Sequence, residues 1–240
     1  CSSINIKNFD ITLVGINGII LPQGIKLDDS IKQSHNSINI PLSLLKDKLS
    51  ELNYPKAVVG PQSHPIINLS FELNGVTKNF RVASRSITMS KISNFRDMGG
   101  YPTIDNRQII WGRLFRSGHL GELSDADKQV LIEQRVNIVC DFRDISESKN
   151  LTSQLPKQIK ITPIPISPMS IINLFKKIDG KNISSIDIDN FMEKANIELA
   201  EDHCEKYKSM FDLLIENNSF STLIHCSAGK DRTGFGAMLI

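Results

Sequence analysis

Short runs of alternating apolar and polar residues mark the first third of the chain, and this period of two is typical of half-buried β-strands. Residues 67–73 form such a run, and the dipeptide Asn74-Gly75 after them favours a tight hairpin turn. Residues 76–83 continue as a second strand-like run. The pattern therefore predicts a small antiparallel β domain with a sandwich-like arrangement over residues 1–86.

Beyond residue 86 the pattern changes to fully apolar runs separated by helical periods, which predicts an α/β domain with a central sheet over residues 87–240. The run 136–140 has no polar alternation, as expected for a strand buried on both faces of a parallel sheet. Other predicted strands are 161–166, placed at an edge by its prolines, and 222–224, and predicted helices are 124–134 and 197–215. Residues 170–190 look irregular, while residues 42–52 fit either a short helix or strand-edge material.

Composition limits the possible functions. The chain has 240 residues, 40% of them hydrophobic, and a net charge of +2. This length allows one large or two small domains, and the near-neutral charge gives no electrostatic footprint for nucleic acid. No apolar stretch reaches the roughly 18 residues that a membrane helix requires. The four cysteines, at positions 1, 140, 204 and 226, lack metal-ligand spacing, so we expect no metal site. A cysteine that reacts must stay reduced, so we expect no structural disulfide at Cys226, whose chemistry is considered next.

The segment His225–Gly234 carries the strongest chemical signal, because it joins an apolar strand to a helix through a glycine-containing loop. Cys226 opens the loop and Arg232 closes it. Backbone N–H groups that turn inward around Gly229, together with the helix N-terminus, would surround an anion. The same surroundings favour a thiolate, the nucleophilic form of cysteine, and the planar guanidinium of Arg232 can hold two phosphoryl oxygens. The loop predicts a nucleophile beside a phosphate-sized anion site.

This loop resembles the signature of the cysteine-dependent tyrosine phosphatases, in which His-Cys is followed by five residues, an arginine and a serine or threonine. Residues 228–233 read Ala-Gly-Lys-Asp-Arg-Thr and are similar to the loop of a bacterial branch of tyrosine and dual-specificity protein phosphatases. Three upstream segments also resemble this branch: 94–101, 112–118 and 141–143. The resemblance covers residues 87–240. It implies the phosphatase fold and hydrolysis of phosphate monoesters through a phosphocysteine intermediate, without metal or organic cofactor.

The resemblance also implies roles for the loop residues. Cys226, Arg232 and Asp231 would be catalytic, with Asp231 as the general acid that protonates the leaving oxygen. Asp187 and Asp189 remain alternative acids, because many relatives carry this acid on a mobile loop upstream of the cysteine. The predicted phosphate site is the run Ser227, Ala228, Gly229, Lys230, Asp231 and Arg232. The predicted supporting residues are His225, Thr233, Arg116, Asp141 and Arg143.

Three arginines in the upstream motifs each follow a phenylalanine, and two aspartates are their possible partners. For Arg96 and Asp97 we favour a buried ion pair that fastens the sheet edge beside the loop. For Arg116, Asp141 and Arg143, a structural role and a contact with substrate remain equal alternatives.

A second His-Cys pair occurs at His203-Cys204. It lacks both the intervening glycine and the arginine, and it lies within a run of helical period. Cys204 is therefore predicted to be a buried structural thiol.

A phosphotyrosine protein is the leading predicted substrate. In the resembled branch, a lysine at the place of Lys230 accompanies activity on phosphoinositides, so a phosphoinositide or small-molecule phosphatase is the first alternative. A non-catalytic phosphate-binding module is the second. Sulfur transfer is a further alternative that the Arg232-Thr233 pair disfavours.

The opening Cys-Ser-Ser resembles a bacterial lipoprotein after removal of its signal peptide. A lipidated Cys1 would tether the protein to the cell envelope, and without it the location would be cytoplasmic or secreted. Apolar residues near Ile240 would normally be covered by following elements, so we expect the catalytic domain to continue beyond this residue.

Overall fold

The computed structural model describes residues 6–14, 20–25, 32–34, 37–39, 64–73, 75–105, 107–170, 188–217 and 221–240. Cys1, Asp187, the stretch 42–52 and most of 170–190 lie outside the described residues. The chain forms two compact units. One comprises Cys1–Arg85 and Gly100–Trp111, and the other comprises Ser86–Gly99 and Gly112–Ile240.

The first unit contains a four-stranded antiparallel sheet in the order β2-β1-β5-β6. Its strands are β1 (Ile6–Val14), β2 (Ile20–Ile25), β5 (Ile67–Leu73) and β6 (Val76–Val82). The predicted hairpin is confirmed, because Leu73 pairs with Val76 and Gly75 has a φ of 79°. A separate two-stranded ladder pairs β3 (Lys32–Ser34) with β4 (Ser37–Asn39).

Residues Gly100–Trp111 join the first unit through contacts of their aromatic side chains. The indole Nε1 of Trp111 donates a hydrogen bond to the carbonyl of Arg81 at 3.0 Å. The guanidinium of Arg85 lies over the ring of Tyr101, 3.6 Å from its centroid, which is a cation–π contact. This hairpin thus packs with the strands that precede it.

The second unit is a five-stranded sheet in the order β10-β9-β11-β8-β7, parallel except for β7. The strands are β7 (Arg96–Asp97), β8 (Leu114–Ser117), β9 (Val136–Asp141), β10 (Lys160–Pro163) and β11 (Ser221–His225). The helices are α3 (Asp125–Glu133), α4 (Ile145–Asn150), α6 (Ile188–Glu201), α7 (Cys204–Glu216) and α8 (Asp231–Leu239). The predicted α/β architecture with a preceding antiparallel β unit is confirmed.

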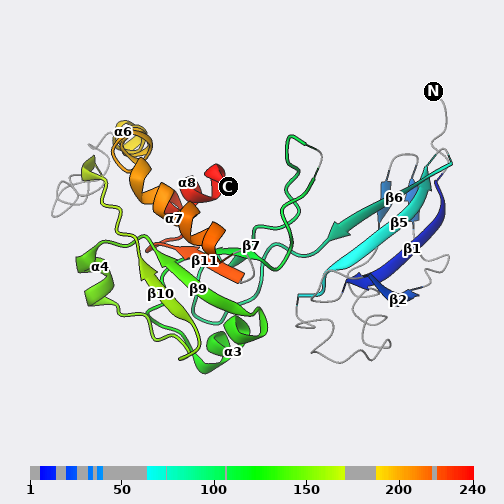
Figure 1. The fold of residues 1–240 in the computed structure, drawn as a ribbon, viewed down its shortest axis with the longest axis horizontal. Coiled ribbons are helices and arrows are strands. Elements are labelled where there is room, and N and C mark those ends of the chain that lie inside the picture. Colours follow the sequence, from blue (N-terminus) through cyan, green and yellow to red (C-terminus); the bar gives the residue numbers. More distant parts are fainter. Residues whose placement is uncertain are drawn as a thin grey trace. The chain divides into compact units, whose positions relative to one another are not determined.

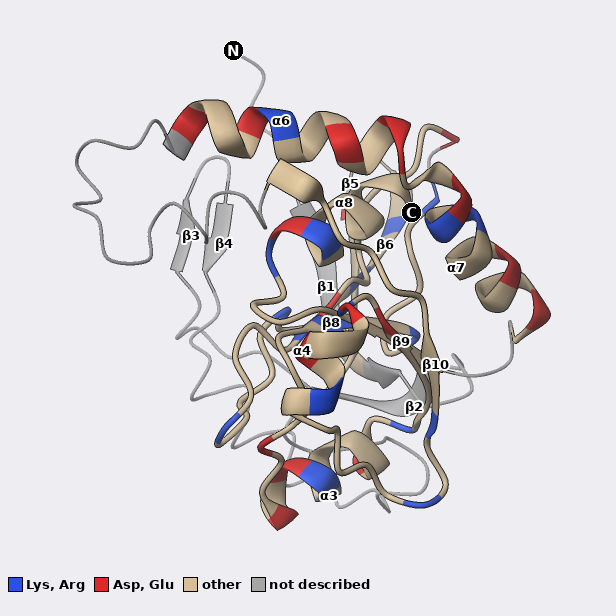
Figure 2. Cartoon of the chain, turned by 90° about the vertical axis from the view of Figure 1, so that its left-hand side faces the viewer, with Lys and Arg blue, Asp and Glu red and all other residues tan. Residues whose placement is uncertain are grey.

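Two hydrophobic clusters cover the two faces of this sheet, with α6, α7 and α8 on one side and α3 on the other (Figure 1). Successive residues of one strand enter different clusters, since Leu223 packs with the cluster on the α3 side and Ile224 with the cluster on the α7 side. The outer surfaces of α6 and α7 carry Lys, Asp and Glu side chains (Figure 2). The strand β11, which leads into the loop at Cys226, therefore lies in the middle of the core, with all five residues buried.

Local sequence signals correctly predicted one helix, α3, and one edge strand, β10. Ser124 caps α3 by accepting from the amide of Asp127, whose carboxylate accepts in turn from the Ser124 amide. β10 lies at a sheet edge as predicted, although it ends at Pro163 rather than at residue 166. Backbone bonds continue past this end, since the amide of Ile164 donates to the carbonyl of Asp141 at 2.8 Å and the amide of Ile166 donates to that of Phe142 at 3.1 Å.

The single helix predicted over 197–215 is wrong. The structure has two helices, α6 and α7, with His203 as the residue that caps the second at a φ of −118°. Cys204 consequently opens α7 on its outer side and is exposed, so the prediction of a buried thiol is also wrong. The buried residues of α7 are instead Tyr207 and Met210.

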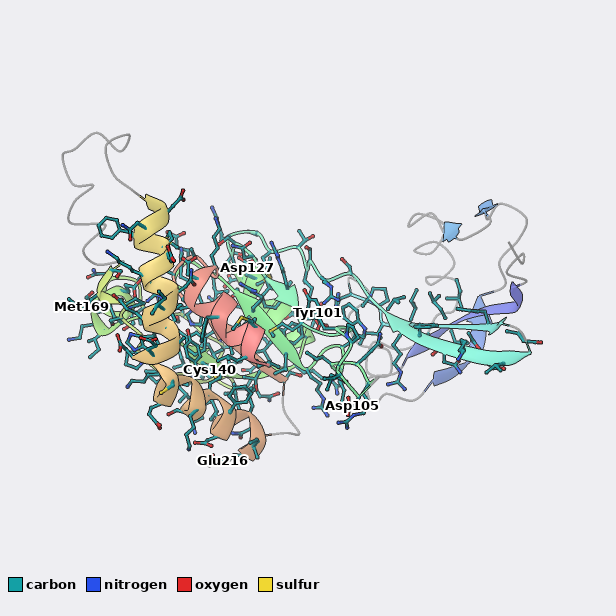
Figure 3. The ribbon with its side chains drawn as sticks, turned by 90° about the horizontal axis from the view of Figure 1, so that it is seen from above. Tyr101, Asp105, Asp127, Cys140, Met169 and Glu216 are labelled. Atoms are coloured by element: carbon teal, nitrogen blue, oxygen red, sulfur yellow. The ribbon has the colours of Figure 1, made fainter. Side chains whose placement is uncertain are left out.

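Cys140 in β9 is a buried thiol of the core and belongs to the cluster on the α6–α8 face of the sheet (Figure 3). Burial raises the pKa of this thiol to about 12, so it stays protonated at neutral pH. Among the described residues, no helix combines the length and the apolarity needed to cross a membrane. The described part also holds no group of three His, Cys, Asp or Glu side chains suited to a metal ion.

Candidate active site

The strand β11 delivers Cys226 to the carboxyl edge of the parallel sheet. Cys226 follows the last strand residue, His225, and is 2% exposed. The helix α8 begins five residues later at Asp231, so its N-terminus returns to the start of the loop. Helix N-termini and the carboxyl ends of parallel strands are where α/β sheets hold anions. The predicted strand, loop and helix are thus confirmed.

Gly229 gives the loop its shape. Its φ of 69° is a conformation that L-residues rarely adopt, and an added Cβ would lie 2.3 Å from the carbonyl oxygen of Ser117. The backbone N–H of Gly229 donates to the sulfur of Cys226 across 3.3 Å. This donor points at the sulfur, so the turn at Gly229 ties the geometry of the loop to the position of the cysteine.

Arg232 is held by a carboxylate that the motif comparison did not identify. Its Nη1 donates to Oε2 of Glu147 at 2.6 Å and its Nη2 donates to Oε1 at 2.8 Å, a bidentate ion pair. Nη1 also donates to the carbonyl of Ile166 at 3.1 Å. Ser227, inside the loop, donates its hydroxyl to the same Glu147 at 2.5 Å. One carboxylate thus positions both the arginine and a loop residue.

Glu147 occupies the first turn of α4, directly after the 141–143 motif. Asp144 and Glu147 form a capping box, in which each side chain accepts from the backbone N–H of the other residue. The sequence signal that could have found it is this Asp-x-x-Glu spacing at the carboxyl end of β9. The capping box fixes α4, and α4 in turn fixes the carboxylate that meets Arg232.

The ion pair determines the charge of both partners. Burial opposes ionisation of Glu147, but hydrogen bonds from Arg232, Ser227 and the Asp144 amide outweigh it and lower its pKa to about 2. Burial likewise opposes the charge of Arg232, yet Glu147 raises its pKa above the usual value. Both groups therefore stay charged at neutral pH.

Asp141 and Arg143 form a second arginine–carboxylate pair, and this one is closed to solvent. Their side chains are 4% and 2% exposed, and Nη2 of Arg143 donates to Oδ2 of Asp141 at 2.7 Å. Arg143 also donates to the carbonyl of Leu151 at 2.7 Å and to the hydroxyl of Ser153 at 3.0 Å. These bonds tie the end of β9 to the segment after α4. The geometry favours the structural alternative for both residues.

Residues from β8 and the preceding segment support the outer side of the loop. Arg116 donates from Nη2 to the carbonyls of Gly229 at 2.8 Å and Lys230 at 3.3 Å. Asn94, with a φ of 56°, donates its amide to the carbonyl of Ala228 at 2.9 Å. Arg116 and Asn94 thus hold the carbonyls of three successive loop residues, Ala228, Gly229 and Lys230.

The buried ion pair predicted for Arg96 and Asp97 is wrong. Arg96 is exposed and donates to Oδ1 of Asn94 at 3.2 Å. Asp97 is 1% exposed and accepts from the amides of Gly99 at 2.8 Å and Gly112 at 2.7 Å. The two residues are consecutive in β7, and successive strand side chains point to opposite faces, which separates them.

His225 is fully buried beneath the loop. Its Nδ1 lies 3.2 Å from the carbonyl of Cys226, while its Nε2 lies 3.5 Å from Oδ1 of Asp141. Burial lowers its pKa to about 4 despite the nearby carboxylate. The imidazole is therefore neutral at pH 7, and in that state Nδ1–H is the donor to the carbonyl. It supports the loop backbone.

The remaining predicted residues take different positions. Thr233 is buried, and within the described residues its hydroxyl has no hydrogen-bond partner. Lys230 and Asp231 are exposed at the start of α8, and Asp189 is exposed in the first turn of α6. The hydroxyl of Tyr207 donates to the carbonyl of Arg232 at 2.9 Å. The structure brings together Cys226, Gly229, Arg232 and Glu147.

A buried cysteine, a loop shaped by Gly229 and an arginine lie together at a helix N-terminus, a place that favours anions in proteins. Residues 87–240 match the model of the tyrosine phosphatase family. The chain belongs to the tyrosine phosphatase family.

Two curated bacterial proteins are similar to this chain. A "putative tyrosine-protein phosphatase" of Cupriavidus necator is 29% identical over 158 residues, which are 64% of this chain and 56% of that protein. A tyrosine-protein phosphatase of Nostoc commune is 28% identical over 125 residues, which are 52% of this chain and 41% of that protein. The chain spans about half the length of these relatives.

Proposed function

We propose that this protein hydrolyses phosphotyrosine in proteins, with Cys226 as the nucleophile. The observation that carries the proposal is the directed loop amide: the N–H of Gly229 donates to the sulfur of Cys226 while Arg232 is held by Glu147 at the same helix N-terminus. Membership of the tyrosine phosphatase family supports it. This arrangement aims one loop donor at the sulfur and places the arginine at the helix N-terminus, where the oxygens of a phosphoryl group would bind.

In the first half-reaction the thiolate of Cys226 attacks phosphorus, forming an S–P bond while the P–O bond to the tyrosine breaks. The loop N–H groups and Arg232 stabilise the charge on the phosphoryl oxygens. Asp231 donates a proton to the leaving phenolic oxygen, a role that its exposed place at the loop rim permits.

In the second half-reaction a water molecule attacks phosphorus and the S–P bond breaks, which returns the thiolate and releases inorganic phosphate. Asp231, now a carboxylate, accepts the proton of this water. The supporting residues act on the protein rather than on the substrate, since their described bonds go to protein groups. They hold the loop and the sheet edge in place, and they are His225, Arg116, Asp141 and Arg143.

The test is phosphate release from a phosphotyrosine peptide under reducing conditions, with wild type, Cys226→Ser and Cys204→Ser compared. Cys204 is the matched control, because its thiol is exposed and lies outside the loop. We expect turnover in wild type and Cys204→Ser and none in Cys226→Ser. If the wild type hydrolyses phosphoinositides but not the peptide, a phosphoinositide is the substrate instead of phosphotyrosine. If it binds the peptide but hydrolyses neither the peptide nor phosphoinositides, the non-catalytic phosphate-binding module is favoured.

The role of Asp231 has its own test. Asp231→Asn is expected to lower kcat on a phosphotyrosine peptide by about 10²- to 10⁴-fold and to remove the basic limb of the pH–rate profile. An aryl phosphate with a very acidic leaving phenol should lose less, since that leaving group needs no proton. Equal losses on both substrates would argue against the general-acid role.

A further inference from the structure

Three basic residues lie on or beside the loop that follows β11. Arg96 lies opposite Arg116 in the antiparallel β7–β8 pair. Arg116 donates to the carbonyls of Gly229 and Lys230, which places its charge against the loop. Lys230 itself is exposed at the start of α8. These three residues form what we call the basic rim.

Arg96 is the exposed member of the rim that a hydrogen-bond chain links to the loop. Its Nη2 donates to Asn94 at 3.2 Å, and the Asn94 amide donates to the carbonyl of Ala228 at 2.9 Å. Asn94 holds this position with a left-handed backbone, at a φ of 56°. Directly opposite residues of an antiparallel pair share one face of the sheet, so Arg96 and Arg116 point to the same side.

Like charges directly opposite one another on neighbouring strands are destabilising. An anion between them would convert this repulsion into attraction, and the guanidinium fork is the side chain best suited to carboxylate or phosphate oxygens. Asp231, beside Lys230, is the acidic residue of the loop, and the proposed reaction employs it as a proton donor. The rim therefore presents positive charge next to the site where a phosphate ester would bind.

We propose that Arg96, together with Lys230, forms a second anion subsite that binds an acidic side chain flanking the phosphotyrosine of a peptide substrate. This inference rests on the proposed tyrosine phosphatase function. Both cations are exposed, so they suit a group that stays at the surface while the phosphotyrosine ring reaches down to Cys226, which is 2% exposed. Arg232 is assigned to the phosphoryl group itself, because Glu147 holds its guanidinium beside the loop.

The test compares two phosphotyrosine peptides that differ only in their flanking residues, Asp and Glu in one and Asn and Gln in the other. Affinity is measured with proteins that carry Cys226→Ser, and kcat/KM is measured with proteins that retain Cys226. Each measurement is made on three proteins: one without a further change, one with Arg96→Gln and one with Lys160→Gln. Lys160 is the control, because it is exposed at the amino end of β10, whereas the loop lies at the carboxyl ends of the strands. Binding is thus measured independently of turnover, so a failure of the catalytic proposal leaves the subsite measurable.

We expect the acidic peptide to bind about two- to fivefold more tightly, with a preference that Arg96→Gln abolishes, Lys160→Gln retains and added salt weakens. An equal preference in Arg96→Gln and in the parent protein would overturn the proposal, as would no preference or no binding. A soluble inositol bisphosphate and monophosphate are compared in the same way. If Arg96→Gln abolishes a preference for the bisphosphate but leaves the two peptides bound equally, the proposal is overturned in favour of a phosphorylated headgroup as the occupant of the subsite. Turnover that fails while the binding preference holds would count against the catalytic proposal alone.

Discussion

Two arginine–carboxylate pairs lie at the carboxyl edge of the same sheet and differ in what surrounds them. Arg143 and Asp141 are almost fully buried, and the remaining donors of Arg143 go to Leu151 and Ser153. Arg232 and Glu147 are 12% and 29% exposed, and the pair adjoins the loop that contains Cys226. The closed pair fastens the fold, whereas the open pair positions an arginine that still faces the anion site. Under the proposed function, the same kind of ion pair serves stability in one place and substrate binding in the other.

The largest expected effect comes from breaking the closed pair. Arg143→Met leaves the Asp141 carboxylate buried without its partner, which we expect to cost about 3–5 kcal/mol of unfolding free energy. Urea unfolding measures this loss. The double variant Asp141→Asn with Arg143→Met should recover part of it, because the uncompensated charge is gone. A cost under about 1 kcal/mol with a selective rise in KM would instead place Arg143 at the substrate.

Arg232→Lys should separate the two pairs most clearly. Lysine retains the charge but lacks the planar fork, so we expect kcat to fall by about 10²- to 10³-fold. The unfolding free energy should change far less than in Arg143→Met, because the Arg232–Glu147 pair is partly exposed. Steady-state kinetics and urea unfolding of the same protein preparation give both numbers. A variant that loses stability but keeps kcat would reverse the assigned roles.

The closed region also predicts a pH dependence of stability. Burial lowers the pKa of His225 from 6.5 to about 4, so the folded state takes up this proton later than the unfolded state. The contribution of His225 to the unfolding free energy is therefore fully present above pH 6.5 and is lost on acidification toward pH 4, by roughly 3 kcal/mol in total. Glu147, with a pKa lowered from 4.5 to about 2, contributes only below pH 4.5. Urea unfolding at a series of pH values between 6.5 and 4 should show that the unfolding free energy of His225→Asn falls less steeply with decreasing pH than that of the wild type. An unchanged pH dependence would contradict the assignment to His225.

A smaller effect is expected in the open pair from Glu147→Gln, which preserves shape and removes the charge. One amide oxygen can still accept from Arg232, but the bidentate pair and the Ser227 contact are weakened. We expect kcat/KM to fall about 10- to 100-fold through misplacement of the guanidinium. Glu133→Gln on α3, an exposed control, should leave kinetics unchanged. Equal kinetics in both variants would show that Arg232 needs no positioning by Glu147.

Where the determinants were local in the chain, the sequence sufficed. The apolar run of β9, the capping box of α3 and the strand, loop and helix around Cys226 each depend on residues a few positions apart. Gly229 could also be assigned in advance, because the turn demands a residue with a positive φ. These features specify where the cysteine and the arginine stand.

Where the determinants were distant, the sequence failed. The Glu147–Arg232 contact spans 85 positions, so neither residue marks the other in the sequence. The break between α6 and α7 was hidden because helical periodicity continues across it, and Cys204 was misplaced as a result. Arg96 was misassigned because exposure on a two-residue edge strand depends on tertiary packing.

The central claim is that Cys226 carries the phosphoryl group during turnover. Rapid acid quench of the wild type mixed with a peptide bearing radiolabelled phosphotyrosine tests it directly, with the labelled residue located by peptide mapping. We predict transient label on Cys226 that appears before free phosphate and is absent in Cys226→Ser. Steady phosphate release without label on this cysteine, together with full activity of Cys226→Ser, would contradict the account.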